Sequence, residues 1–168
     1  MDSITDIYVT GLKNAHAMEN QALSIMRPQV ARIEHYPDVL ARLEQHIRET
    51  EGQIERLDSL LDSVGADRSA IKDTALSISG MMAAMGHTFA PDEIVKNSFA
   101  NFAFENFEIA AYKSLITLAG EAGQANAVSL LRQNLDEELA MANWLDSNIE
   151  AVTLKYAALR VSGEQAKK

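Results

Sequence analysis

Four glutamates lie where a hydrophobic core is expected: Glu19, Glu49, Glu108 and Glu138. Each falls on the apolar side of a long segment in which hydrophobic residues recur every three or four positions, the pattern of an amphipathic helix. An unpaired buried carboxylate is very costly, because burial removes the water that stabilises its charge. Four such side chains therefore predict either a compensating cation inside the fold or a different fold.

The spacing of these glutamates indicates two similar helical hairpins. Glu49 follows Glu19 by 30 residues, and Glu138 follows Glu108 by 30 residues. In an antiparallel pair of helices, two residues lie at the same height when they are equally far from the turn. The midpoints are residues 34 and 123, and both fall in predicted turns. Each hairpin is therefore expected to bring two carboxylates to its middle.

Together the four carboxylates carry a charge of −4, which two divalent cations would neutralise. Oxygen-rich sites suit Fe(II), Mn(II) or Mg(II), and the absence of Cys argues against zinc. His46 lies one turn before Glu49 and is expected either to bind the metal or to hydrogen-bond a ligand. Three more polar side chains lie one turn from the glutamates: Gln53, Glu105 and Tyr112. Gln53 is interpreted as a weak ligand or a core hydrogen-bonding group, and Glu105 as a metal ligand, a solvated residue or a partner of a ligand.

These side chains need long helices to position them. Only three Pro and eight Gly interrupt the chain, and no strand pattern is seen between them. Helices are expected over residues 4–33, 37–65, 91–119 and 124–148, with a last helical segment over 151–160 and a frayed tail over 163–168. We interpret residues 1–168 as a single domain made of a hairpin (1–65), a crossover with a short helix (66–90), a second hairpin (91–150) and a C-terminal segment (151–168). One long crossover between two hairpins is the ferritin-like topology, so the predicted fold is an all-α four-helix bundle.

Several segments resemble the YciE/YciF family of ferritin-like bacterial stress-response proteins, and the resemblance covers nearly the whole chain. It is carried by residues 15–21 (AHAMENQ), 46–53 (HIRETEGQ), 107–112 (FEIAAY) and 135–138 (LDEE), with Tyr36-Pro37 and residues 92–96 (DEIVK). The sequence is most similar to the YciE branch. The resemblance implies a rubrerythrin-like bundle, a dinuclear metal site and a homodimer, but no particular reaction.

One departure from the wider ferritin-like class affects the site. Di-iron members place a His three residues after the Glu in the second and fourth helices. Here those positions are Gly52 and Met141, neither of which is a ligand for a hard divalent ion.

Two functional hypotheses follow. In the first, a carboxylate-bridged dinuclear site of iron, or alternatively manganese, reacts with a small-molecule oxidant such as oxygen or peroxide, and the ligands are Glu19, Glu49, Glu108 and Glu138 with His46, Gln53 and Glu105. In the second, the bundle is a non-enzymatic stress protein with a degenerate metal site, acting through dimer or partner contacts. Whether the protein catalyses a reaction is left open.

The charge balance excludes other classes of partner. The formal net charge is −9, which disfavours nucleic acids and anionic membranes. No signal peptide and no membrane-spanning stretch are seen, so the sequence predicts a cytoplasmic protein.

Overall fold

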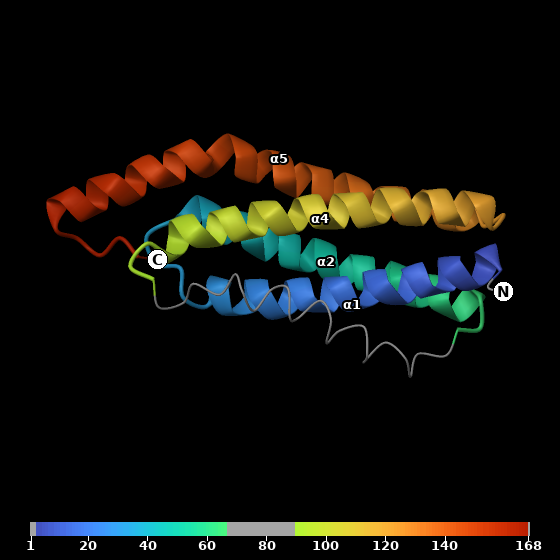
Figure 1. The fold of residues 1–168 in the computed structure, drawn as a ribbon. Helices are drawn as coiled ribbons and strands as arrows, with labels where there is room; N and C mark the ends of the chain where they lie inside the picture. The colour runs from blue at the N-terminus through green and yellow to red at the C-terminus, as the bar shows by residue number, and fades with distance from the viewer. Residues whose placement is uncertain (1–2, 67–89, 168) are drawn as a thin grey trace.

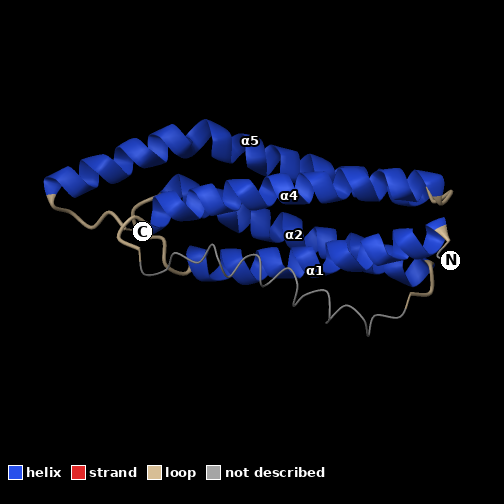
Figure 2. Cartoon of the chain, viewed as in Figure 1, coloured by secondary structure: helices blue, strands red, loops and turns tan. Residues whose placement is uncertain are grey.

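A computed structural model describes residues 3–66 and 90–167 of the chain. Four long helices form an elongated bundle, as Figure 1 shows: α1 (Ile4–Val30), α2 (Pro37–Ser63), α4 (Glu93–Glu121) and α5 (Ala125–Ser162). Figure 2 shows only helices and loops in these parts of the chain. The predicted all-α, ferritin-like bundle is confirmed.

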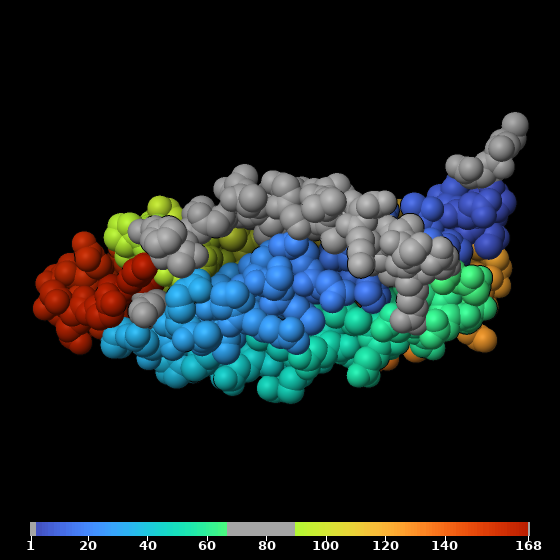
Figure 3. Space-filling view, turned by 90° about the horizontal axis from the view of Figure 1, so that it is seen from below, coloured from blue at the N-terminus to red at the C-terminus, as the bar shows by residue number. Residues whose placement is uncertain are grey.

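The helices pair as two antiparallel hairpins. α1 packs against α2, and α4 packs most extensively against α5. Figure 3 shows α1 and α2 side by side on one face of the molecule. The turns span residues 31–36 and 122–124, so the midpoints 34 and 123 both fall within them, as the glutamate spacing predicts. The end of α2 and the start of α4 lie at opposite ends of the bundle (Figure 1), which is the arrangement that a long crossover connects.

Local sequence signals explain where the helices begin. Ser3 and Asp6 form a reciprocal capping box at the start of α1, with the backbone N–H of each bonded to the side chain of the other. Pro37 occupies the first turn of α2, where a missing N–H costs nothing. Pro28 lies only two residues before the end of α1. α1 continues through Pro28 and ends at Val30, three residues before the predicted end at residue 33.

One end of the bundle core is apolar, whereas its middle and the end near the start of α4 contain buried polar side chains. Buried Tyr8, Leu12, Leu57 and Leu131 fill one end of the core. Gly11 allows α1 and α4 to approach closely, because a Cβ atom there would lie 2.8 Å from Leu115 Cδ1. The layers of apolar side chains leave the predicted polar residues between them.

The C-terminal region differs from the prediction in two respects. α5 is continuous from residue 125 to residue 162, rather than broken near residue 150, because no Pro or Gly interrupts it before Gly163. The tail is docked rather than frayed: Ala166 is 1% exposed, its carbonyl accepts a hydrogen bond from Tyr36 Oη at 2.7 Å, and the Lys167 carbonyl accepts one from the Ile94 N–H at 2.9 Å. The tail thereby satisfies an N–H in the first turn of α4.

The crossover prediction, including its short helix, concerns residues 66–90 and lies almost wholly outside the described residues. Among the helices that are described, none is long and apolar enough to cross a membrane.

Candidate metal centre

The predicted ligands lie on all four helices at the middle of the bundle. Glu19 comes from α1, Glu105 and Glu108 come from α4, Glu138 comes from α5, and α2 supplies the rest: His46, Glu49 and Gln53. All of these side chains are buried except that of Glu49, which is 19% exposed. The solvated alternative for Glu105 is therefore wrong, since it lies inside the core.

The structure brings four of these residues together: His46, Glu105, Glu108 and Glu138 each offer one ligand atom, and those atoms all lie within 4.8 Å of one another. We call these residues the metal cluster. His46 Nε2 lies 3.2 Å from Glu105 Oε2 and 3.4 Å from Glu138 Oε2. The cluster thus combines three carboxylates and one imidazole from α2, α4 and α5.

Glu19 lies at the border of the metal cluster. Its Oε1 accepts a hydrogen bond of 2.5 Å from Tyr112 Oη, which in turn accepts one of 2.9 Å from the Asn134 amide. Its Oε2 has no hydrogen-bonding partner. Tyr112 therefore fixes one oxygen of Glu19 and leaves the other available to a ligand.

Glu49 is not one of the residues that the structure gathers into the metal cluster. Its Oε2 accepts hydrogen bonds from Arg42 Nη1 at 3.0 Å and from His46 Nδ1 at 2.9 Å, and its Oε1 accepts one from the Gln45 amide at 2.7 Å. A carboxylate bonded to the far nitrogen of a histidine orients the ring and increases its basicity as a ligand. The observed contacts suit this orienting role, and direct ligation by Glu49 stays a prediction.

Gln53 of α2 contacts Glu138 of the metal cluster. Its amide donates to Glu138 Oε1, while its own oxygen has no hydrogen-bonding partner. The interpretation as a core hydrogen-bonding group is confirmed by this contact, and ligation by the free oxygen stays a prediction. Gly52 and buried Met141 offer no imidazole, so His46, on the other side of Glu49, provides the ring that faces the carboxylates.

Burial dominates the electrostatics of the carboxylates. Burial and the nearby Glu138 charge raise the pKa of Glu19 and of Glu108 well above the usual range. Burial also raises the pKa of Glu105 to about 8, although His46 opposes the shift. Burial would raise the pKa of Glu138 as well, but the hydrogen bond and charge of His46 hold that pKa below its ordinary value.

For His46 and Glu49, hydrogen bonds and neighbouring charges outweigh the effect of burial on the pKa. Burial lowers the pKa of His46, but Glu105, Glu138 and Glu49 outweigh it and raise the pKa well above the usual range. Burial raises the pKa of Glu49, but hydrogen bonds from His46, Gln45 and Arg42 hold it at about 2. The imidazolium and Glu138 therefore form a charged pair among carboxyl groups that favour their neutral form.

The unpartnered atoms show that the site fits a divalent cation. Three buried carboxylate oxygens around His46 have no hydrogen-bonding partner: Glu19 Oε2, Glu108 Oε1 and Glu108 Oε2. Two more, Glu105 Oε2 and Glu138 Oε2, share the single Nε2 of His46 at 3.2 and 3.4 Å. Buried polar atoms almost always have a hydrogen-bonding partner, so a group of unpartnered atoms at one place requires an explanation. A hard cation bound by oxygen and imidazole ligands would satisfy them together.

Sequence reasoning missed the arginines and the asparagine that support the site. Arg42 and Arg56 lie seven residues before and after Glu49, which places both on its side of α2. Arg56 donates to Glu137 and to Asn134, which lies one turn before Glu138. Extending the helical spacing by one or two turns from each glutamate would have identified these side chains.

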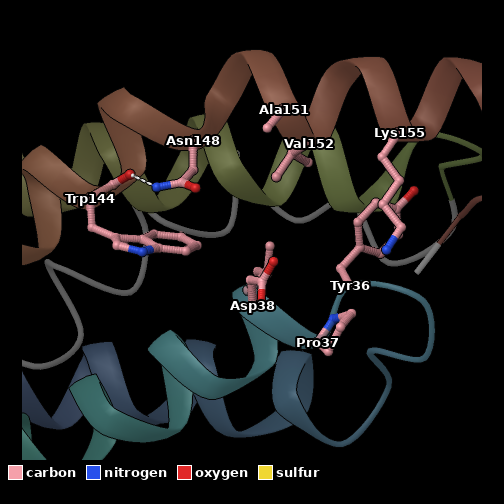
Figure 4. Close-up of a pocket in the computed structure, with 9 residues that line it drawn as sticks. Tyr36, Pro37, Asp38, Trp144, Asn148, Ala151, Val152 and Lys155 are labelled. Carbon is pink, nitrogen blue, oxygen red and sulfur yellow. Dashed lines mark hydrogen bonds between the residues drawn. The ribbon is translucent and has the colours of Figure 1, made fainter.

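A separate small cavity lies between the start of α2 and the second half of α5. It has a volume of about 70 Å³ and is lined by Tyr36, Pro37, Asp38, Val39, Trp144, Asn148, Ala151, Val152 and Lys155. Figure 4 shows Lys155 folded toward the ring of Tyr36, where its Nζ lies 5.4 Å from the ring centre. The lining includes none of the metal-cluster residues, so this cavity is distinct from the candidate metal centre.

Comparisons with known proteins agree with the helical architecture. The chain is 28% identical to protein YciF of Escherichia coli over 147 residues, which is 83% of this chain and 86% of YciF. The crystal structure of the E. coli stress protein YciF has a TM-score of 0.76, 25% identity, and coverage of 89% of this chain and 96% of that one. A crystal structure from Xanthomonas campestris pv. campestris also has a TM-score of 0.76, with 29% identity and coverage of 90% and 93%.

The family assignment follows from a match along most of the sequence. Residues 3–158 match the family described as a domain of unknown function, DUF892. The resemblance to YciF is confirmed, whereas greater similarity to the YciE branch stays a prediction. Because the match spans nearly the whole helical bundle and its predicted ligands, the chain belongs to the DUF892 family.

Proposed function

We propose that this protein binds divalent metal ions in the middle of its bundle, in a carboxylate-bridged dinuclear site of iron or manganese. The observation that carries this proposal is the group of carboxylate oxygens buried around His46, three without a hydrogen-bonding partner and two that share its Nε2. In a purely structural core these buried oxygens would lower the stability of the fold, because no hydrogen bond or cation would replace the lost water. A pair of divalent ions would neutralise the four ionised carboxylates of Glu19, Glu105, Glu108 and Glu138.

The positions of the unpartnered oxygens suggest which residues would hold each ion. His46, Glu105, Glu108 and Glu138 would hold one ion, because their ligand atoms already converge. Glu19 would contribute to the second, since its free oxygen belongs to a carboxylate that interacts electrostatically with Glu105, Glu108 and Glu138. Glu108 would be able to bind through either oxygen, since neither has a hydrogen-bonding partner.

Bound iron or manganese would supply one-electron chemistry toward oxygen or peroxide. The chain's own residues position the ligands for it. Glu49 orients His46, Gln53 holds one oxygen of Glu138, and Tyr112 holds one oxygen of Glu19. The shell of buried apolar side chains excludes bulk water from the metal cluster.

The similarity to the E. coli stress protein supports a role in the cell's response to stress. That the protein acts in the cytoplasm and as a homodimer is part of this proposal and rests on the sequence alone. A second function remains in consideration because Gly52 and Met141 replace the histidines of the wider class. In that alternative the bundle is a non-enzymatic stress protein with a degenerate site, and its dimer or partner contacts carry the function.

Metal-linked stability tests the proposal. Mn(II) at about 100 times its dissociation constant should raise the free energy of unfolding by about 2.7 kcal/mol for each ion bound, because the ions bind only the folded chain. Urea unfolding of wild type with Mn(II) or with a chelator measures this difference. Glu108→Gln should abolish it, and Asp146→Asn, an exposed change on α5, should retain it. An equal unfolding free energy with and without Mn(II) in wild type would favour the degenerate bundle.

A further inference from the structure

A groove runs along the α2/α5 side of the bundle above the metal cluster. One part is lined by Glu49 of α2 and by residues of α5 from Ser129 to Ala140. The second part is lined by Asp38, Ala41, Arg42 and Gln45 of α2 and by Ala140, Trp144 and Asn148 of α5. Because Ala140 lines both parts, and because Glu49 is bonded to Arg42 and Gln45, they form one continuous hollow that we call the α2/α5 groove.

Glu49, which lines this groove, is directly hydrogen-bonded to His46 of the metal cluster. Glu49 accepts a hydrogen bond from His46 Nδ1 at 2.9 Å, and the other ring nitrogen faces Glu105 and Glu138 at 3.2 and 3.4 Å. Glu49 is 19% exposed, whereas the side chains of Glu105 and Glu138 are 4% and 0% exposed. Glu49 is therefore the predicted ligand that solvent reaches most easily.

A second hydrogen-bonded chain connects the same groove with Glu19. Glu137 lines the groove and accepts a hydrogen bond from Arg56, which also donates to Asn134. The Asn134 amide donates to Tyr112 Oη, and Tyr112 donates to Glu19. Both sides of the candidate site are thus linked to the α2/α5 groove, each through a carboxylate that an arginine of α2 holds in place.

The groove on the opposite side of the bundle has a different lining. It lies between α1 and α4 and is lined by Ile7, Thr10, Gly11, Asn14, Ala15, Ala111, Ser114, Leu115 and Leu118. None of these nine residues is ionisable, and no described hydrogen bond links one of them to the metal cluster. The whole α2/α5 groove instead carries four carboxylates, Asp38, Glu49, Asp136 and Glu137, and two arginines, Arg42 and Arg132, a formal charge of −2 for its lining. A cleft with a net negative charge attracts cations.

We propose that divalent cations reach the metal cluster through the α2/α5 groove, and that Glu49 is the carboxylate that receives them. This inference rests on the proposed function, since it assigns the access route of the same site. Arg42 and His46 donate to the same oxygen of Glu49, so both hydrogen bonds must break before that oxygen can bind an ion. Arg42 therefore acts as a latch on the route, and His46 lies directly behind it.

Blocking the groove tests the route. Ala140 and Ser114 are both small, exposed helical residues, one in each groove. Ala140→Arg should slow Mn(II) uptake, followed by stopped-flow mixing, by about tenfold or more through bulk and charge repulsion, with an unchanged number of bound ions at equilibrium. Ser114→Arg should leave the rate at the wild-type value. Equal rates in the two variants, or slower uptake in Ser114→Arg, would overturn the route.

Changing the latch tests the role of Glu49 and Arg42. Arg42→Met keeps the length of the side chain but removes its charge, so uptake should become faster than in wild type. Glu49→Gln should slow it, and Glu49→Asp should restore part of the rate. A purely structural role for Arg42 would give slower or unchanged uptake, and this result would overturn the proposal that Arg42 restricts access to Glu49. If wild type binds no Mn(II) at equilibrium, the proposed function itself fails, whereas normal binding with unaltered rates rejects only this inference.

Discussion

At the scale of single residues, the chemistry depends on which carboxylates share the imidazole of His46. The ring lies between Glu49 on its outer side and two buried glutamates, Glu105 and Glu138, on its inner side. Replacing Glu49 by glutamine should therefore have a different effect from replacing Glu105 or Glu138 by glutamine. The outer change alters how the ring is held, while the inner change removes a proposed ligand.

The variants Glu49→Gln and Glu138→Gln should therefore differ. Glu138→Gln should lose the bound ions, because it removes a ligand at the centre of the metal cluster. Glu49→Gln should keep the ion count but bind about 10-fold to 100-fold more weakly, as is usual when the partner of a ligating histidine is changed. Isothermal titration with Mn(II) measures both constants. Complete loss of binding in Glu49→Gln would instead make Glu49 a direct ligand.

The stability of the chelator-treated protein should fall as the pH rises. Glu105 has a pKa of about 8 in the fold, and burial also raises the pKa values of Glu19 and Glu108. A raised carboxyl pKa means that the folded state binds protons more tightly than the unfolded state. Its stabilising contribution is full below the unfolded value and is lost through the folded value. The raised pKa of His46 acts in the same direction.

Urea unfolding between about pH 5 and about pH 8 should accordingly show a decrease of at least about 1 kcal/mol. Added Mn(II) should reverse this trend, since ligands must be ionised to bind a cation. The lowered pKa of Glu49, about 2, contributes constant stability in this range. A flat profile without metal would show that the buried carboxyl groups are not held in their neutral form.

At the scale of the helices, a buried amide pair joins α1 and α4. Gln29 and Asn101 exchange two hydrogen bonds of 3.1 and 2.9 Å in the core. Asn101→Ala should cost about 1–3 kcal/mol of unfolding free energy, because it leaves the Gln29 amide buried and unsatisfied. Asn106→Ala, an exposed change on the same helix, is the matched control and should be nearly neutral. Thermal and urea unfolding of both variants measure the difference, and equal costs would contradict the account.

The helices themselves were largely predictable because helical periodicity is a local signal. The equal spacing of Glu19 from Glu49 and of Glu108 from Glu138 also located both turns. The contacts of Glu49 could not be predicted in the same way. Whether a carboxylate enters the core or pairs with Arg42 depends on the rotation of α2 against its neighbours, which periodicity defines only within about one residue.

The tail illustrates the same limit. Residues 163–167 have the composition of a frayed end, yet Tyr36, Glu93 and Ile94 hold them through contacts from distant parts of the chain. Sequence spacing carries no information on such contacts. The unbroken path of α5, in contrast, could have been predicted, because no Pro or Gly occurs between residues 125 and 162.

At the scale of the whole molecule, the resemblance to YciE and YciF predicts a homodimer. Exposed phenylalanines on α4 suggest where it forms, since Phe99 is 52% exposed and Phe107 is 40% exposed. Analytical ultracentrifugation should give about twice the chain mass of 18.4 kDa. Phe107→Ser should shift the equilibrium toward the monomer, and Lys113→Ser, another exposed site on α4, should not. A monomeric wild type would contradict the prediction.

Metal content after anaerobic loading with Fe(II) or Mn(II), followed by desalting, tests the central claim most directly. The account predicts about two ions per chain in wild type and in the exposed α5 variant Asp146→Asn, and loss of both ions in Glu138→Gln, because Glu138 lies at the centre of the metal cluster. No retained metal in wild type, or equal metal in wild type and Glu138→Gln, would contradict it.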